Sequence, residues 1–193
     1  RSPRPWACPR SFMEPFLSYR YPIGPAGADT LEDKPHIQRM WAEKVRGIPE
    51  QVHPLRDGGF YLPLYFGCNS FVDHEIGRVI DETRRLGLDD TWILFTSDHG
   101  DLMGDHQLLS KGACMYDWAA RIPLVVSPPA DRREAAAISS PVSHADLLPT
   151  LMNLAGLEPP PLLDGEDITP LFAGEERPGK AAFVEFNRFE IGH

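Results

Sequence analysis

The stretch Thr91-Trp92-Ile93-Leu94-Phe95-Thr96-Ser97-Asp98-His99-Gly100 decides the fold class of this chain. Its first part, residues 91–96, is a continuous apolar run of the kind found in parallel strands that are buried on both faces. Its second part turns polar and reaches a glycine, as expected where a strand ends and a loop begins. We therefore predict a strand over residues 92–96 with a loop directly after it.

Helical and extended patterns alternate on both sides of this strand. Between residues 62 and 86, apolar side chains recur at three- and four-residue steps, which predicts an amphipathic helix ended by Gly87. Later segments predict a short helix at 115–120, a strand at 122–127, a helix at 143–155 and a third apolar run at 181–186. Strands that alternate with helices favour an α/β fold with a parallel sheet and right-handed crossovers.

Composition and charge restrict the class of protein. The 193 residues suffice for one domain with a core, and no apolar run approaches the length of roughly 18–20 residues needed to cross a bilayer. With 28 acidic and 19 basic side chains, the net charge of −9 makes nucleic acid an unsuitable partner. Three cysteines without close spacing predict ordinary thiols and neither a disulfide framework nor a zinc knot.

The predicted organisation has three parts. Residues 1–59 are rich in proline and glycine and are expected to be a loop-rich remnant, residues 60–175 the α/β core, and residues 176–193 the start of a small further subdomain. The chain begins at Arg1 without methionine or a signal-peptide pattern, so we expect an amino-terminal truncation. The compartment, cytoplasm or periplasm, and the oligomeric state therefore stay open.

The loop after the first strand concentrates side chains that bind metal ions. Three aspartates and two histidines lie within residues 98–106, and ligands bind at the carboxyl ends of strands in open α/β sheets. Asp98 and His99 can share one divalent ion if the backbone bends there, and Lys111 could bind a substrate oxyanion or protonate a leaving group. The alternative is that all three are exposed loop and surface charges.

Several ordered blocks over about residues 60–190 resemble the sulfatase family of the alkaline-phosphatase superfamily. They are Phe71-Val72-Asp73-His74-Glu75-Ile76-Gly77-Arg78, Phe95-Thr96-Ser97-Asp98-His99-Gly100, Gly104-Asp105-His106, Lys111-Gly112, Arg121-Ile122-Pro123-Leu124, Ser143-His144-Ala145-Asp146-Leu147-Leu148-Pro149-Thr150-Leu151 and the region around Pro170-Leu171-Phe172. The resemblance implies part of a doubly wound, mostly parallel sheet with helices on both faces, truncated at its amino-terminal side.

The resemblance also implies a chemistry. Such enzymes hydrolyse small-molecule or saccharide sulfate esters with a formylglycine nucleophile that is activated on a divalent cation. Asp98 and His99 correspond to one pair of metal ligands, with calcium expected first and manganese or zinc as alternatives, and Lys111 corresponds to the lysine that contacts the sulfate. The other matching polar residues are interpreted as surface, packing or ligand-supporting groups: His74, Asp105, His106, Arg121 and His144.

The chain departs from the family pattern in its nucleophile. No Cys/Ser-x-Pro-x-Arg motif is present, and the paired aspartates that supply the remaining metal ligands near the start of such enzymes are also absent. Three hypotheses follow: a sulfatase whose formylglycine lies in a missing amino-terminal part, a phosphonate monoester or phosphodiester hydrolase of the same superfamily, and a remnant without catalytic function.

Overall fold

The computed structural model describes residues 7–19, 21, 24–49, 61–112, 114–129 and 136–185. Contacts divide these residues into two compact units, one extending to Pro129 and the other comprising residues 136–185. The predicted three-part division of the chain stays a prediction, and its residues 1–6, 50–59 and 186–193 lie outside the described residues. Among the described helices, none has the length and apolarity of a membrane-spanning segment.

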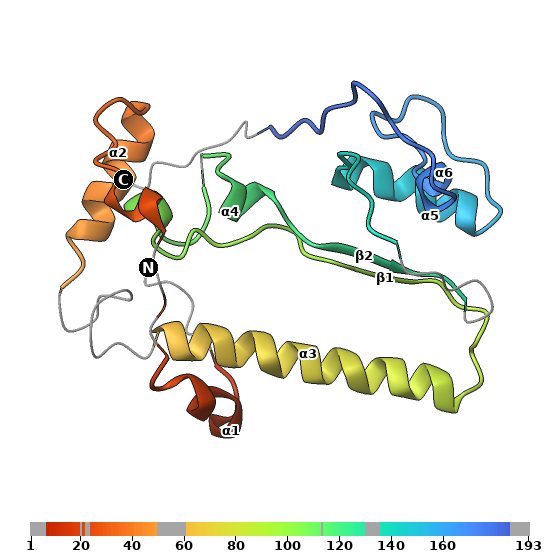
Figure 1. Ribbon diagram of the computed structural model, residues 1–193, viewed down its shortest axis with the longest axis horizontal. Coiled ribbons are helices and arrows are strands. Elements are labelled where there is room, and N and C mark those ends of the chain that lie inside the picture. The colour runs from red at the N-terminus through yellow and green to blue at the C-terminus, as the bar shows by residue number, and fades with distance from the viewer. Residues whose placement is uncertain are drawn as a thin grey trace. The chain divides into compact units, whose positions relative to one another are not determined.

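The longest element is α3, which runs from Tyr61 to Arg85 and confirms the predicted amphipathic helix (Figure 1). Gly87 ends it at a positive φ of 67°. The amides of Gly87 and Leu88 donate to the carbonyls of Arg84 and Thr83, each at 3.0 Å, which is the Schellman pattern of hydrogen bonds. Val72 and Val79, however, are 54% and 65% exposed, so part of the predicted buried stripe faces solvent.

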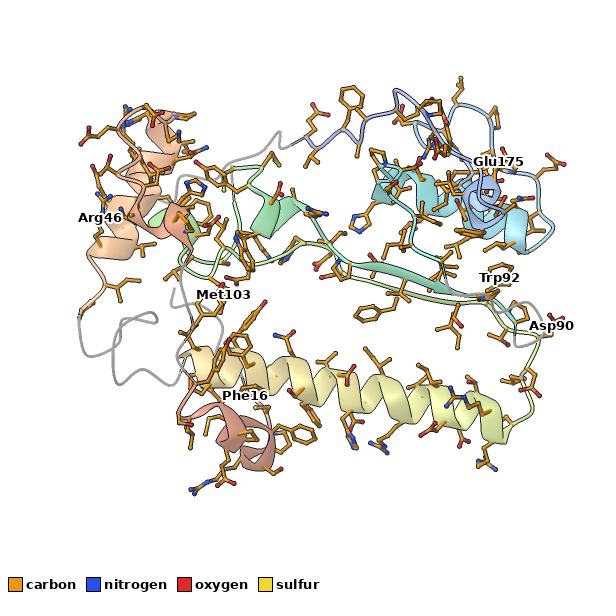
Figure 2. All side chains as sticks on the ribbon, in the orientation of Figure 1. Phe16, Arg46, Asp90, Trp92, Met103 and Glu175 are labelled. Carbon is orange, nitrogen blue, oxygen red and sulfur yellow. The ribbon has the colours of Figure 1, made fainter. Side chains whose placement is uncertain are left out.

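Two short elements pack against the beginning of α3. Helix α1 (Arg10–Met13) and the 3₁₀ turn η1 (Glu14–Phe16) both contact it. The rings of Phe12 and Phe71 lie 5.2 Å apart edge to face, and those of Phe16 and Phe66 lie 5.6 Å apart. Figure 2 shows Phe16 beside the first turns of α3.

The predicted strands form, but they run in opposite directions. Strand β1 (Ile93–Thr96) pairs antiparallel with β2 (Leu124–Ser127), with Ile93 opposite Ser127 and Thr96 opposite Leu124 (Figure 1). The prediction of a parallel sheet is therefore wrong for this pair. Parallel strands need a long crossover, usually a helix, whereas the described part of the connection contains only the short η4 (Asp105–Gln107) and α4 (Asp117–Ala120).

The two strands are also less buried than predicted. Phe95 in β1 is 41% exposed and Val125 in β2 is 56% exposed, so the strands are not covered on both faces. The third apolar run does not form a strand within its described residues 181–185, and Phe186 lies outside the described part of the chain. The alternation of helices and strands expected of the α/β class is nevertheless present.

A small core lies beneath the loop that follows β1. It brings the Asp29–Leu31 segment, after η2 (Pro25–Ala28), and helix α2 (His36–Arg46) against residues 102–119. Its buried members are Leu31, Ala42, Leu102, Leu108, Cys114 and Ala119, with Trp41 and Tyr116 packed against them. The loop is thus anchored by apolar residues that follow the predicted metal ligands Asp98 and His99 in the chain.

The second unit is built around one buried carboxylate. Asp146 ends the turn η6 (His144–Asp146), and its side chain accepts the amides of Ser143 at 2.9 Å and Glu166 at 2.8 Å. Helix α5 (Leu147–Leu154) follows and ends in a second Schellman pattern at Gly156, φ 69°, while α6 (Thr169–Phe172) packs against it. The predicted helix at 143–155 and its glycine stop are confirmed.

Candidate metal centre

The candidate site begins at the end of β1, where the backbone is fixed on both sides. The hydroxyl of Thr96 donates to the carbonyl of Pro123 at 2.8 Å, and the amide of Gly100 donates to the carbonyl of Ala119 at 2.9 Å. A Cβ at Gly100 would lie 1.8 Å from the carbonyl oxygen of Trp118, a distance that no side chain can tolerate. Glycine is therefore required where the loop passes α4.

Asp98 and His99 form the predicted pair within this fixed segment. Oδ2 of Asp98 lies 3.3 Å from Nε2 of His99, and the amide of His99 donates to Oδ1 of Asp98 at 3.0 Å. Ser97 adds a hydrogen bond from its hydroxyl to the carbonyl of His99 at 2.9 Å. The two adjacent side chains thus point toward one another, as one shared cation requires.

The hydrogen bonds of His99 define which ring nitrogen is free to act as a ligand. Nδ1 lies 2.8 Å from the carbonyl oxygen of Gly100, which can only accept, so Nδ1 carries the proton. In the neutral ring Nε2 is then an acceptor that faces the Asp98 carboxylate. The contact between Nδ1 and the Gly100 carbonyl also orients the ring, as such contacts usually do in metal-binding histidines.

Lys111 completes the cluster from twelve residues further along the chain. Its ammonium group contacts Nε2 of His99, and the residue is exposed to solvent. The structure therefore brings together all three predicted site residues, with a cation, the ammonium group, beside the nitrogen and the carboxylate. A Cβ on the following Gly112 would overlap the ring of Trp41 at 1.5 Å, so this glycine allows the chain to pass α2 directly after Lys111.

The charges around Asp98 favour its ionised form. Burial acts to raise the pKa of this carboxyl, but the neighbouring His99, backbone amides and Lys111 outweigh it, so the pKa is lowered. The side chain remains 84% exposed, and that of His99 is 36% exposed. Asp98 is thus a carboxylate with open sites for a ligand around it.

The donor set supports only part of a cation site. Among the residues that the structure describes, no group of three or more His, Cys, Asp or Glu side chains could hold a metal ion. Asp98 and His99 supply one hard oxygen and one imidazole nitrogen, which are two of the roughly six to eight ligands that calcium takes, and manganese accepts the same two donor types.

The loop between His99 and Lys111 turns tightly, and several of its residues have left-handed backbone conformations. Positive φ angles occur at Met103, Gly104, His106, Gln107 and Ser110. The carboxylate of Asp101 accepts the amides of Met103 at 3.0 Å and Ser110 at 3.2 Å. Asp101 therefore closes the base of the loop, a role that the sequence pattern did not reveal.

His106 fastens the tip of this loop to a distant segment. Its Nδ1 lies 2.6 Å from Oδ2 of Asp29, and its ring stacks on Tyr116 with centroids 3.7 Å apart. Gln107 beside it donates to the carbonyl of Asp29 and accepts from Arg46 at 2.8 Å. Asp29 has no sequence signal that could have identified it, because its partner lies 77 positions away.

The other polar residues of the matching blocks lie apart from this cluster. The rings of His74 and Phe12 lie 5.5 Å apart beside α3, and the side chain of Arg121 is 85% exposed and lies 3.9 Å from Asp117. His144 belongs to the second unit. Among these residues, Asp105 and His106 lie in the loop itself, where Oδ2 of Asp105 is 3.7 Å from Nε2 of His106.

Known proteins are similar to this chain in sequence. The family model described as Sulfatase matches residues 14–157. An uncharacterized sulfatase of Escherichia coli, YidJ, is 45% identical over 190 residues, which are 98% of this chain and 36% of that protein. The chain therefore spans about a third of the length of this relative.

Two solved structures have a similar fold. One is BT4656 in complex with its substrate D-glucosamine-2-N,6-O-disulfate, with a TM-score of 0.71, 21% identity and coverage of 91% of this chain and 46% of the other. The second is the phosphonate monoester hydrolase of Agrobacterium radiobacter, with a TM-score of 0.54, 36% identity and coverage of 62% and 24%. The predicted alkaline-phosphatase-like fold is thereby confirmed.

Proposed function

The chain belongs to the sulfatase family, and on that premise we propose that it supplies the cation- and anion-binding loop of a metal-dependent sulfuric ester hydrolase. Asp98 and His99 would hold one side of a divalent cation, and Lys111 would contact the sulfate group. A cation bound there would act as a Lewis acid that stabilises negative charge on oxygen.

One observation carries this proposal: Nε2 of His99 contacts both the Asp98 carboxylate and the Lys111 ammonium group. Nδ1 keeps its proton on the carbonyl of Gly100, so Nε2 retains its lone pair for a positive partner. The ammonium group of Lys111 is that partner here. Asp98 and His99 would hold the cation, and the three N–H donors of Lys111 would be available to a substrate oxyanion.

The chain's own residues have distinct proposed roles. Asp98 contributes negative charge to the cation, while the carbonyl of Gly100 fixes the ring of His99 in the tautomer that binds through Nε2. Lys111 would stabilise charge that develops on the sulfate oxygens or on the leaving oxygen. No Cys/Ser-x-Pro-x-Arg motif is present, so the proposed formylglycine is not among these residues and turnover by this chain alone is not expected.

We propose a small-molecule or saccharide sulfate ester as the substrate and calcium as the first choice of cation. A bound sugar sulfate in the similar structure of BT4656 supports the substrate class. Manganese and zinc stay as alternatives because imidazole is a softer ligand than an amide or carboxylate oxygen. The net charge of −9 argues against a nucleic acid partner.

A phosphonate monoester or phosphodiester hydrolase is the second candidate function. The structural similarity to a phosphonate monoester hydrolase at 36% identity favours it. A carboxylate, an imidazole and a lysine suit phosphonate oxygens as well as sulfate oxygens, because both groups are tetrahedral anions. The third candidate, a protein without catalytic function, would keep the fold and hydrolyse neither ester.

Hydrolysis assays on the full gene product that contains these 193 residues would distinguish the three candidate functions. Aryl sulfate, aryl phosphonate and diaryl phosphate esters of one phenol would be compared with calcium and with manganese. The proposal predicts that aryl sulfate gives the highest kcat/KM and that Lys111→Ala lowers it by about 10²–10³. Lys180→Ala is the control, because that lysine pairs with Glu166 in the second unit.

A preference for the phosphonate or phosphate ester would replace the proposal by its second candidate. Absence of turnover of all three esters, in a protein that binds the cation and folds normally, would support the non-catalytic candidate.

A further inference from the structure

Two cysteines that lie far apart in the sequence meet in the first unit. Cys8 is separated from the first residue of α1 by Pro9, and Cys68 lies within α3. The sulfur of Cys8 lies against the turn of α3 that carries Cys68, close enough for the two thiol groups to interact. Both are free thiols and both are partly exposed, whereas the third cysteine, Cys114, is 5% exposed and belongs to the core beneath the site loop.

The backbone of α3 is shaped to admit the sulfur of Cys8. A Cβ at Gly67, the residue before Cys68, would lie 2.9 Å from Sγ of Cys8 and 2.9 Å from Cα of Met13. Any larger residue at this position would push Cys8 away from the helix. Gly67 therefore permits the close approach that places the two thiols together.

Aromatic contacts before and after Cys68 in α3 hold the segment that follows Cys8 against this helix. Phe12 packs edge to face on Phe71 at 5.2 Å, and Phe66 contacts Tyr19 at 5.2 Å as well as Phe16 at 5.6 Å. These contacts join the segment after Cys8 to the turns of α3 that flank Cys68. Because they do not require a bond between the sulfurs, the dithiol state is already folded and positioned.

We propose that Cys8 and Cys68 form a redox-responsive pair that closes an intramolecular disulfide when a low-molecular-weight disulfide such as oxidised glutathione is present. The thiolate of one cysteine attacks a sulfur of the oxidant and releases one glutathione thiolate. The second cysteine then attacks the mixed disulfide and releases the other. The two cysteine thiols lose two protons and two electrons in total, and the oxidant is reduced to two thiols.

The closed disulfide would covalently join the start of α1 to α3. Cross-linking residues 60 positions apart restricts the unfolded chain, so the oxidised protein should unfold at a higher denaturant concentration than the reduced protein. Formation should accelerate at alkaline pH because the thiolate is the nucleophile. Burial first, and then the nearby Cys8, raise the pKa of the Cys68 thiol, in agreement with this pH dependence.

The test is to incubate the reduced 193-residue chain with oxidised glutathione and to analyse it by intact mass and non-reducing peptide mapping. The expected product is a monomer lighter by about 2 Da, in which one peptide pair links Cys8 to Cys68 and Cys114 stays reduced. Cys114→Ser should give the same product. Cys8→Ser and Cys68→Ser should stop at a single glutathione adduct.

A second probe does not depend on oxidation. Phenylarsine oxide binds two neighbouring thiols together, so it should bind the wild-type chain and Cys114→Ser in a one-to-one ratio and resist displacement by monothiols. It should bind neither Cys8→Ser nor Cys68→Ser in this way. Stable glutathione adducts on both cysteines of the wild type, a link to Cys114, or dimers joined between chains would overturn the proposal.

Discussion

Nδ1 of His106 lies 2.6 Å from Oδ2 of Asp29, although 77 positions separate these residues. The same Asp29 carboxylate accepts the amide of Leu31 at 2.8 Å, so one side chain fixes both its own turn and the tip of the site loop. The side chains of Asp29 and His106 are 21% and 18% exposed, which limits competition from water. The path of the loop from His99 to Lys111 therefore depends on a contact outside it.

Replacing His106 by alanine should loosen this loop without unfolding the chain. Losing one partly buried hydrogen bond and the stacking on Tyr116 should raise amide exchange over residues 102–110 by roughly tenfold. Hydrogen exchange with mass spectrometry measures this region directly. Asp33→Asn is the matched control, because the side chain of Asp33 is 76% exposed and forms an ion pair with its sequence neighbour Lys34. Equal protection of residues 102–110 in His106→Ala and wild type would show that the contact does not hold the loop.

The same contact predicts a dependence on acid. The amide of Leu31 first, and then His106, lower the pKa of Asp29 below its ordinary value of 3.8. A carboxyl whose pKa is lowered in the folded state stabilises that state above its unfolded pKa, and this contribution is lost as the pH falls through the folded pKa. Protection of the loop should thus decrease below about pH 3.8.

The carboxyl of Asp105 has the opposite effect on the pH dependence of stability. Burial raises the pKa of its carboxyl, so the folded state takes up that proton more readily on acidification. The variant Asp29→Asn separates the two effects, because it removes the loss of protection in acid and keeps Asp105. If loop protection in wild type and Asp29→Asn fell in parallel below pH 3.8, Asp29 would not be the group responsible.

Two glycine substitutions should have opposite effects on stability. Gly100→Ala places a Cβ 1.8 Å from a backbone oxygen of Trp118, so the loop must move, at a cost of about 1–3 kcal/mol in the free energy of unfolding. Gly77→Ala lies within α3 with no atom inside 4 Å of the added Cβ and should stabilise the helix by about 0.5–1 kcal/mol. Urea denaturation measures both, and a stabilising Gly100→Ala would contradict the described approach of the loop to α4.

Local patterns in the sequence predicted two of the helices well, whereas α2 lies in the region expected to be rich in loops. Helices α3 and α5 end at Gly87 and Gly156 as expected, because apolar spacing and a glycine at the helix end act over a few residues. The cluster of Asp98, His99 and Lys111 was also predicted, through its position after a strand and its resemblance to a family.

Contacts between distant segments could not be predicted in this way. The antiparallel pairing of β1 with β2 depends on how the connection returns, and the apolar runs alone fit either direction. Asp29 and His106, like Cys8 and Cys68, meet only because separate elements pack together. No spacing rule links such pairs.

A titration of the ¹⁵N-labelled 193-residue chain with Mn²⁺, followed by NMR line broadening, tests most directly whether Asp98 and His99 share a divalent cation. Mn²⁺ accepts both carboxylate and imidazole ligands and broadens nearby resonances even when binding is weak. We expect broadening centred on the amides of residues 97–100, its loss in Asp98→Asn and His99→Gln, and stronger binding in Lys111→Met, where no ammonium group competes for Nε2. Broadening centred on another acidic segment such as Asp89-Asp90, or equal broadening in wild type and both ligand variants, would contradict the proposed metal centre.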